Sequence, residues 1–224
     1  MNGFLPRFAV AWLVSVGAAC TSAPVHYYTL TPTPEKTRAA SETTVAIDVR
    51  VVQIPSQLDR AELMVRTGPT ELTLLENERW ASPVKNEIKD ALRLELQRRL
   101  GGMTGSHPAF AKLTLDIDVR HLEAEFGRYA LLEASWSATL ASWSATLSAA
   151  DQRSNGARVT TCRFQADEKI DAGYVGMVEG YQREIAALAD AIAAVLTSSA
   201  SGIDAPCQRA VESSAGGSGP KDHE

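Results

Sequence analysis

The feature that most constrains the fold is a pair of stretches in which apolar residues occupy every second position, in residues 45–52 and 113–119. Because successive side chains of a strand point to opposite faces, this period of two predicts strands with one buried face. Two shorter apolar runs, Leu63–Arg66 and Leu72–Leu75, flank Gly68-Pro69, so we expect two short strands joined by a turn. The alternating apolar residues are Val45, Ile47, Val49 and Val51 in the first stretch, and Leu113, Leu115, Ile117 and Val119 in the second.

Two longer stretches have the spacing of amphipathic helices. The first begins with Ser82 as N-cap and Pro83 at the first helical position, and it ends at Gly101-Gly102. The second runs from about Met177 to Leu196. The order of strands, helix, strands and helix predicts an α+β fold. We expect a single domain with a mixed or antiparallel β-sheet and two amphipathic helices packed on one face. The apolar faces consist of Val84, Ile88, Leu92, Leu96 and Leu100, and of Tyr181, Ile185, Leu188, Ile192 and Val195.

The N-terminus has the features of a secretory signal. One arginine is followed by an apolar run of roughly ten residues, too short to span a bilayer, and then by the small residues before Cys20. The segment Val16–Cys20 resembles a bacterial lipobox, although Gly17 stands where leucine is usual. We therefore predict a lipoprotein signal peptide in residues 1–19 and lipid attachment at Cys20. The alternative is an ordinary signal peptide cut after Ala19, which leaves Cys20 as a free thiol.

Composition divides the mature chain into three parts. Residues 20–40 are rich in Thr, Pro and Ala and form a tether that contains a short Tyr-rich strand. Residues 41–197 form the folded domain, and residues 198–224 are predicted to be disordered because they contain few apolar residues. Removing residues 1–19 takes one arginine and no acid from a net charge of −5, which leaves −6. A weakly acidic chain without a basic block is not expected to bind nucleic acid.

The two remaining cysteines, Cys162 and Cys207, form an even pair if Cys20 is acylated. A disulfide persists in an oxidising compartment and would contribute roughly 4 kcal/mol in the chain-entropy model. The alternative is two unpaired thiols. Neither cysteine has a His or Cys neighbour at metal-ligand spacing, so we expect no zinc site.

Residues 134–140 and 141–147 both read ASWSATL. Each copy alternates with a period of two, which favours a strand. Because seven is odd, a straight strand would turn the second copy to the opposite face of the sheet. We interpret the repeat as a duplicated strand segment, with a bulge or turn near residues 140–142, or with one copy looped out.

The sequence contains no motif that predicts catalysis. His121, Glu123 and Glu125 would lie on one side of a strand, but we interpret them as its polar face and not as a metal site. No serine has a G-x-S-x-G context and no Gly-rich phosphate loop follows a strand. We therefore predict no enzyme activity, no cofactor and no metal.

Four segments together resemble the auxiliary lipoproteins of Mce-linked ABC transport systems, of the PqiC (YmbA) type. They are Cys20 followed by Tyr27–Leu30, Val51–Pro55 leading through Leu58-Asp59-Arg60 to Leu63–Gly68, Glu78–Pro83 before the first helix, and Cys162–Phe164 before a helix rich in Ala and Leu. The resemblance covers about residues 20–197. The lipobox, the second heptad and the long polar tail depart from the family.

This resemblance implies a periplasmic domain, lipid-anchored in the outer membrane, that works with an Mce-domain protein and an inner-membrane permease and ATPase. The implied function is lipid movement between the two membranes. Because some relatives look to be ring-forming, the resemblance also includes a homo-oligomeric ring among the expected partners. Thr21 after the cysteine is no aspartate-type retention signal, which by analogy favours the outer membrane. The alternatives are a structural or assembly lipoprotein of the outer membrane without a transport partner, and a periplasmic hydrolase.

Six residues are candidates for a partner surface. We also expect Tyr27, Tyr28 and Leu30 to let the tether re-enter the fold as an edge strand. The structural alternative for Asp59 and Arg60 is an exposed loop ion pair worth under about 1 kcal/mol, and for Trp80 it is a hydrophobic staple beside the helix N-terminus. The six residues are Tyr27, Tyr28, Asp59, Arg60, Arg79 and Trp80.

Overall fold

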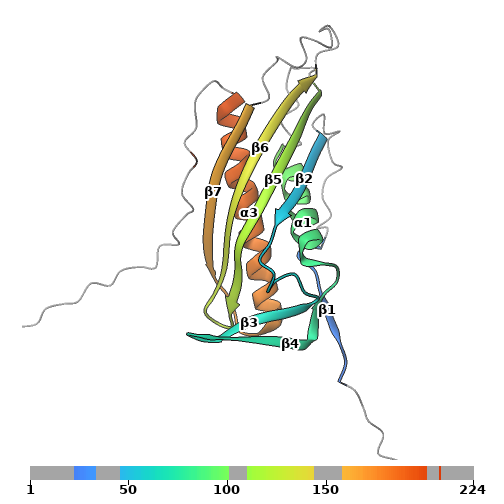
Figure 1. Cartoon of the computed structure of the whole chain (residues 1–224), viewed down its shortest axis with the longest axis vertical. Coiled ribbons are helices and arrows are strands. Elements are labelled where there is room, and N and C mark those ends of the chain that lie inside the picture. Colours follow the sequence, from blue (N-terminus) through green and yellow to red (C-terminus); the bar gives the residue numbers. More distant parts are fainter. Residues whose placement is uncertain (1–22, 34–45, 101–109, 144–157, 201–206, 208–224) are drawn as a thin grey trace, which may run out of the picture.

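The computed structural model describes residues 23–33, 46–100, 110–143, 158–200 and Cys207. Its elements divide into two sheets and two helices, as Figure 1 shows. In chain order they are β1 (His26–Tyr28), β2 (Ala46–Gln53), β3 (Glu62–Gly68), β4 (Glu71–Trp80), α1 (Val84–Leu100), β5 (Phe110–Glu125), β6 (Tyr129–Trp143), β7 (Arg158–Lys169) and α3 (Gly173–Ala200).

The larger sheet has the strand order β2-β5-β6-β7. β2 runs parallel to β5, whereas β5, β6 and β7 are successively antiparallel, so the sheet is mixed. Both helices lie behind this sheet in Figure 1 and cover the same face. The α+β class, the single domain and the two helices on one face are therefore confirmed.

Alternate residues of the central strands form the core between this sheet and the helices. Leu115 and Ile117 of β5 are fully buried, and Ala91 and Leu92 of α1 are buried on the helix side. Burying a leucine or isoleucine side chain stabilises the fold by about 1.5–3 kcal/mol relative to leaving it exposed. The predicted apolar helix faces are both buried, and they include Val84, Ile88, Leu96 and Leu100 of α1, and Tyr181, Ile185, Leu188, Ile192 and Val195 of α3.

The smaller sheet has the order β1-β4-β3 and was not foreseen as a separate sheet. β3 and β4 form the predicted hairpin around Gly68-Pro69, but β4 continues to Trp80, five residues beyond the predicted end. The register shifts between Glu62 and Leu63, where three extra residues of β4 are accommodated. Such an irregularity bends the hairpin away from a regular ladder.

Both helices differ slightly from the predicted bounds. α1 begins at Val84, because the first helical hydrogen bond runs from the Glu87 N–H to the Pro83 carbonyl. α3 begins at Gly173 and extends to Ala200, into the segment predicted to be disordered. Gly180 allows α3 to approach the sheet, since a Cβ there would lie 2.4 Å from Ile170 Cγ2.

The first copy of the ASWSATL repeat lies in β6, where Trp136 and Ala138 are buried. The pairing of β6 with β5 continues without a shift from Leu140 to Trp143, so the bulge predicted near residues 140–142 is absent from this ladder. The irregularity lies instead between Val119 and His121 of β5. The rest of the second copy, residues 144–147, is outside the described residues.

Within the described ranges, no helix is both long enough and apolar enough to cross a membrane. The predicted signal peptide, residues 20–22 and 34–40 of the tether, and the tail from residue 201 lie outside those ranges, except for Cys207.

Candidate functional site

The predicted Tyr-rich strand enters the fold as β1, the edge strand of the smaller sheet. β1 runs parallel to β4, with Tyr27 opposite Arg79 and Tyr28 opposite Trp80. The Ala81 N–H donates a hydrogen bond of 2.7 Å to the Tyr28 carbonyl. We call the segment His26–Leu30, together with the side chains that hold it, the tether junction.

A buried carboxylate from α1 holds the end of this segment. Glu87, 5% exposed, accepts hydrogen bonds from the Leu30 N–H (2.9 Å to Oε2), the Thr29 hydroxyl (2.7 Å to Oε2) and the Ser82 hydroxyl (2.8 Å to Oε1). Hydrogen bonds to a charged group are roughly twice as strong as those between neutral groups. Glu87 is also in the first turn of its helix, where negative charge is favourable.

The second helix and the core complete this attachment. Gln182 of α3 donates a hydrogen bond from Nε2 to the Thr29 carbonyl, at 3.1 Å. Leu30 is fully buried in the hydrophobic core. The start of the domain is therefore held by both helices and by the smaller sheet, and the expectation that the tether re-enters as an edge strand is confirmed.

A second acid lies where β1 meets β4. His26 Nδ1 is 3.1 Å from Glu78 Oε1. Burial raises the pKa of Glu78, but the Tyr28 hydroxyl and His26 outweigh it and hold that pKa below its ordinary value. Burial and the neighbouring Glu78 carboxylate raise the pKa of Tyr28 to about 12. The carboxylate of Glu78 is therefore ionised at neutral pH and the Tyr28 hydroxyl is protonated.

Aromatic rings connect β1 to the start of α3 and to the turn between β5 and β6. The ring centroids of Tyr28 and Tyr174 are 6.3 Å apart, and those of Phe126 and Tyr174 are 5.3 Å apart in an edge-to-face arrangement. Such pairs contribute about 0.5–1.5 kcal/mol beyond the area they bury. The aromatic rings therefore link the tether junction to α3 and, through Tyr174, to the turn between β5 and β6.

The structure places four of the predicted partner-surface residues in partly or fully exposed positions outside the core. Tyr27 is 66% exposed, and Asp59 and Arg60 are exposed in the loop before β3. Asp59 forms an ion pair with Lys85 Nζ at 3.0 Å. Arg79 is half-buried and its Nη2 lies 3.4 Å from Glu62 Oε1.

Tyr28 and Trp80 are less accessible. Tyr28 is half-buried within the tether junction, as described above. Trp80 is only 7% exposed, and its ring centroid lies 6.3 Å from that of Tyr181. The partner-surface interpretation of Trp80 is therefore wrong, because the indole fills the space between the end of β4 and α3.

The three residues considered as metal ligands have separate partners. Glu123 binds the Arg66 guanidinium through both oxygens and accepts a hydrogen bond of 2.7 Å from the Tyr129 hydroxyl. The Arg66 guanidinium holds the pKa of Glu123 below its ordinary value. His121 lies 3.8 Å from Glu133, and Glu125 pairs with Arg128. In the part of the chain that the structure describes, no three His, Cys, Asp or Glu side chains form a group suited to a metal ion.

Two shallow hollows lie between β3 and β5. Both are lined by Gln57, Leu58, Met64 and Leu122. His121 lines one of them, but Glu123 beside it is occupied by Arg66 and neither hollow contains a serine. These hollows do not present the serine or paired carboxylates with a histidine that a hydrolase would need.

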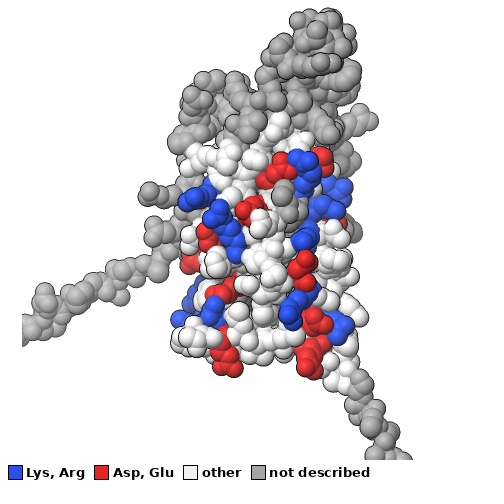
Figure 2. Space-filling model, viewed as in Figure 1, with Lys and Arg blue, Asp and Glu red and all other residues white. Residues whose placement is uncertain are grey.

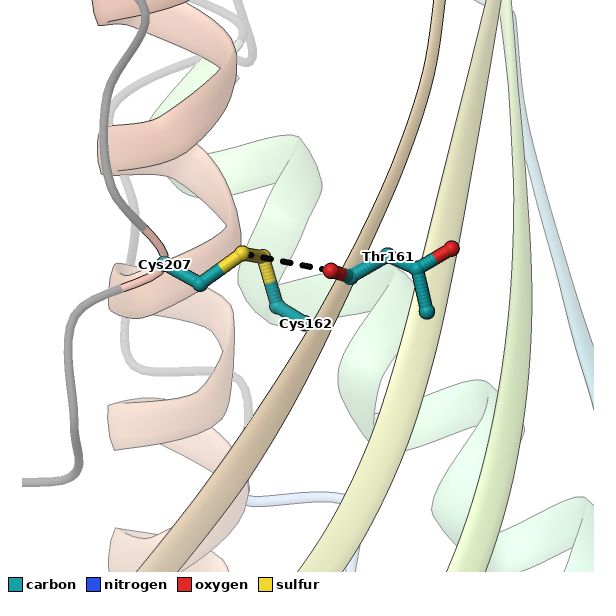
Figure 3. The surroundings of a disulfide bond; sticks show 3 residues. All are labelled: Thr161, Cys162 and Cys207. Carbon is teal, nitrogen blue, oxygen red and sulfur yellow. Dashed lines mark hydrogen bonds between the residues drawn. A yellow bond between two sulfur atoms is a disulfide. The ribbon is translucent and has the colours of Figure 1, made fainter.

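Cys162 and Cys207 form a disulfide with a Cα–Cα distance of 5.4 Å, within the usual range. Cys162 is buried on β7 and Cys207 is exposed beside it (Figure 3). The Sγ of Cys207 also lies 3.3 Å from the Thr161 carbonyl oxygen. The bridge fixes residue 207 against β7, and the alternative of two free thiols is not the arrangement in this structure.

Sequence reasoning missed Glu87, Gln182 and Glu78. A usable signal existed for Glu87, which is three residues after Val84 and therefore falls on the apolar face of α1. A charged residue on such a face needs a buried partner. The partner groups at Thr29 and Leu30 are almost sixty residues away and could not be identified from spacing.

Comparison with known proteins now gives the class of protein. Residues 28–193 match the family model described as "ABC-type transport auxiliary lipoprotein component". This match spans well over half of the chain: it begins at the last residue of β1 and covers β2 to β7, all of α1 and most of α3. The chain therefore belongs to this family of ABC transport auxiliary lipoproteins, as its sequence resemblance predicted.

Among curated relatives, the chain is similar to the intermembrane transport lipoprotein PqiC of Escherichia coli strain K12 and of Shigella flexneri. Each is 25% identical over 141 residues, which cover 61% of this chain and 73% of the relative. A crystal structure of an uncharacterized protein has the same fold, with a TM-score of 0.57 and 17% identity over 78% of this chain and 99% of that one.

Proposed function

We propose that this chain is anchored by a lipid on Cys20 in the outer membrane, faces the periplasm, and supports lipid trafficking between the inner and outer membranes without catalysing a reaction. It does so by docking to an Mce-domain partner of an ABC transport system with an inner-membrane permease and ATPase. The family membership and the name of the PqiC relatives support the transport role.

The observation that carries the proposal is the tether junction. β1 begins six residues after Cys20, and Glu87 and Gln182 hold the chain that follows it. Six extended residues span at most about 20 Å. A lipid on Cys20 would therefore keep the domain close to the bilayer, whereas a loosely attached domain could move away from it.

The exposed charged members of the predicted surface are the proposed contact with a protein partner. Asp59 and Arg60 lie on the loop before β3 and Arg79 lies on β4, whereas the exposed Tyr27 on β1 is considered separately below. A homo-oligomeric ring, as the family resemblance implies, would present several copies of this surface to one partner.

Replacement of Cys20 tests the anchor. We expect Cys20→Ala to move the protein from the membrane fraction to the soluble periplasm, while Thr21→Ala leaves it in the membrane. Unchanged fractionation of Cys20→Ala would contradict the anchor, and mass spectrometry of the mature N-terminus checks acylation directly.

Co-purification tests the partner. We expect the wild-type chain, extracted from membranes in detergent, to recover a permease, an ATPase and an Mce-domain protein. Reversing the charges with Asp59→Lys and Arg60→Glu should reduce that recovery, and Arg93→Glu on α1 serves as the control. Recovery of cell-wall or assembly factors instead would favour a structural lipoprotein without a transport partner.

A further inference from the structure

The large apolar side chains that remain exposed gather at one end of the molecule. Among the side chains that the structure describes, they belong to β1 and the residue before its start, to β4 and to the first turn of α3, all at the lower end of Figure 1. None of them lies on α1 or on the larger sheet. They are Val25 (41% exposed), Tyr27 (66%), Leu72 (43%), Leu74 (37%) and Val175 (63%), and we call them the apolar end.

The chain enters the domain at this same end. Val25 and Tyr27 are five and seven residues after Cys20. A lipid at Cys20 would hold them within about 25 Å of the bilayer even if the intervening chain were fully extended. Because the tether junction fixes β1 to both helices, the apolar end has a fixed position relative to the rest of the domain.

The side chains behind the apolar end make it rigid and give it interfacial chemistry. Tyr174 packs against Tyr28 and Phe126 directly beside Val175. Tyrosine has an apolar ring and a polar hydroxyl, and it is enriched at the level of lipid headgroups. Aliphatic and tyrosine side chains on a preformed surface suit the boundary between water and hydrocarbon better than they suit bulk water.

We propose that the apolar end rests on the surface of the phospholipid bilayer and inserts these side chains among the headgroups. The inference rests on the proposed lipid anchor at Cys20. It adds a second membrane contact, made by the folded domain itself, which fixes how the domain stands on the membrane.

Charge at this end is mixed, so the contact does not depend on anionic lipid. Arg128 is paired with Glu125 in the turn beside Phe126, and Asp171 is exposed just before α3. In Figure 2, red and blue side chains alternate along the lower part of the visible face. Phospholipids without net charge are therefore sufficient, and we expect little dependence on salt.

The test uses the full lipidated chain in vesicles of phosphatidylethanolamine and phosphatidylcholine. A photoreactive diazirine amino acid replaces Tyr27 in one sample and Ala194 in another. Ala194 is exposed on the same helix as Val175, and nineteen helical residues separate them by about 28 Å. We expect phospholipid adducts from position 27 and few from position 194, with the same result at low and high salt.

A charge placed in the apolar end should weaken the contact without unfolding the domain. Val175→Asp introduces an acid into the first turn of α3, which is favourable for the helix but unfavourable at the edge of hydrocarbon. We expect it to lower the yield of lipid adducts at position 27 by roughly tenfold. Ala194→Asp on the same helix should leave the yield unchanged.

The outcomes separate this inference from the proposed function. Adducts with protein at position 27, equal lipid adducts at both positions, or no effect of Val175→Asp would overturn the membrane contact while leaving the anchor intact. If the anchor itself fails, the protein does not stay with the vesicles in flotation, which is measured before illumination. Lipid adducts confined to position 27 and reduced by Val175→Asp establish the contact.

Discussion

Two buried glutamates show how differently the two regions of this protein are stabilised. In the tether junction, the Glu87 carboxylate accepts three hydrogen bonds, from Thr29, Leu30 and Ser82. In the layer formed by the larger sheet and the helices, Glu184 is fully buried, and neither of its oxygens has a hydrogen-bond partner among the described residues. Burial raises the pKa of Glu184 to about 9, with a further contribution from Glu168.

The comparison indicates that the layer is held mainly by apolar packing and the junction by directional hydrogen bonds. Apolar packing tolerates Glu184, whose carboxyl oxygens lack hydrogen bonds within the described part of the chain. The stabilising free energy of the surrounding apolar contacts exceeds the cost of burying this polar group. The junction has only a three-residue strand and one buried leucine, so it depends on the hydrogen bonds to Glu87 and Gln182. The two regions should therefore respond differently to substitution.

The largest effect is expected from a cavity in the layer. Leu115→Ala removes a fully buried side chain of the central strand β5 and should lower the free energy of unfolding by about 3–5 kcal/mol. Urea unfolding measures this change. Leu72→Ala on β4, where the side chain is 43% exposed, is the control and should change stability by less than about 1 kcal/mol. Equal effects would contradict the assignment of the core.

Loss of the disulfide should have the next largest effect. Cys207→Ser removes a bridge that spans 45 residues, and the chain-entropy model gives a loss of up to about 4 kcal/mol. The parent protein treated with reductant should show the same lower urea midpoint as the variant. A midpoint unchanged by either treatment would show that the bridge does not stabilise the folded state.

Glu184→Gln should stabilise the protein at neutral pH. The folded-state pKa of about 9 lies above the ordinary value of 4.5, so the folded state retains a proton that the unfolded state has lost between these values. Stability contributed by this group therefore falls as pH rises from about 4.5 to 9. At pH 7 the penalty is on the order of 3 kcal/mol, which sets the scale of the gain from glutamine.

The pH dependence distinguishes this gain from a change in packing. Glu168 and Asp167 of β7, Arg183 and Tyr181 are the charged or titratable groups around Glu184, and all are retained in the variant. The gain from Glu184→Gln should therefore be small at pH 5 and large at pH 8 in urea unfolding. A gain independent of pH would contradict a neutral, buried Glu184.

Replacement of Glu87 should have the smallest effect on global unfolding and the largest on the junction. Glu87→Ala leaves the buried Leu30 N–H without a partner, at a local cost of about 1–3 kcal/mol. We expect limited proteolysis to cut near residues 23–33 faster, while the urea midpoint changes less than for Leu115→Ala. Glu87→Gln keeps an acceptor and should lie between the parent and Glu87→Ala.

The layer could be predicted from the sequence because its signals are periodic and local. The alternation in β5 and the apolar faces of α1 and α3 lead directly to the buried residues. The division into two sheets could not be predicted, because it depends on the irregular pairing of β3 with β4 and not on any local pattern. The bulge expected near residues 140–142 was also placed wrongly. The irregularity lies in the partner strand β5, between Val119 and His121, and no local pattern in the sequence indicates it.

The junction could be predicted only in part. The apolar and aromatic cluster at Tyr27, Tyr28 and Leu30 correctly indicated an edge strand. Trp80 was misinterpreted because its burial depends on Tyr181, a hundred residues later in the chain. The role of Glu87 depends on Thr29 and Leu30, which are also far away in the sequence. The sequence indicated this role only by placing a charged residue on the apolar face of α1.

Hydrogen–deuterium exchange at the Leu30 amide tests most directly the claim that polar contacts fix the tether to the domain. In the lipidated parent protein, we expect this amide to be protected nearly as well as amides of β4. In Glu87→Ala it should exchange much faster, while the amides of β5 and β6 keep their protection. Rapid exchange at Leu30 in the parent protein, or no change in the variant, would contradict the account.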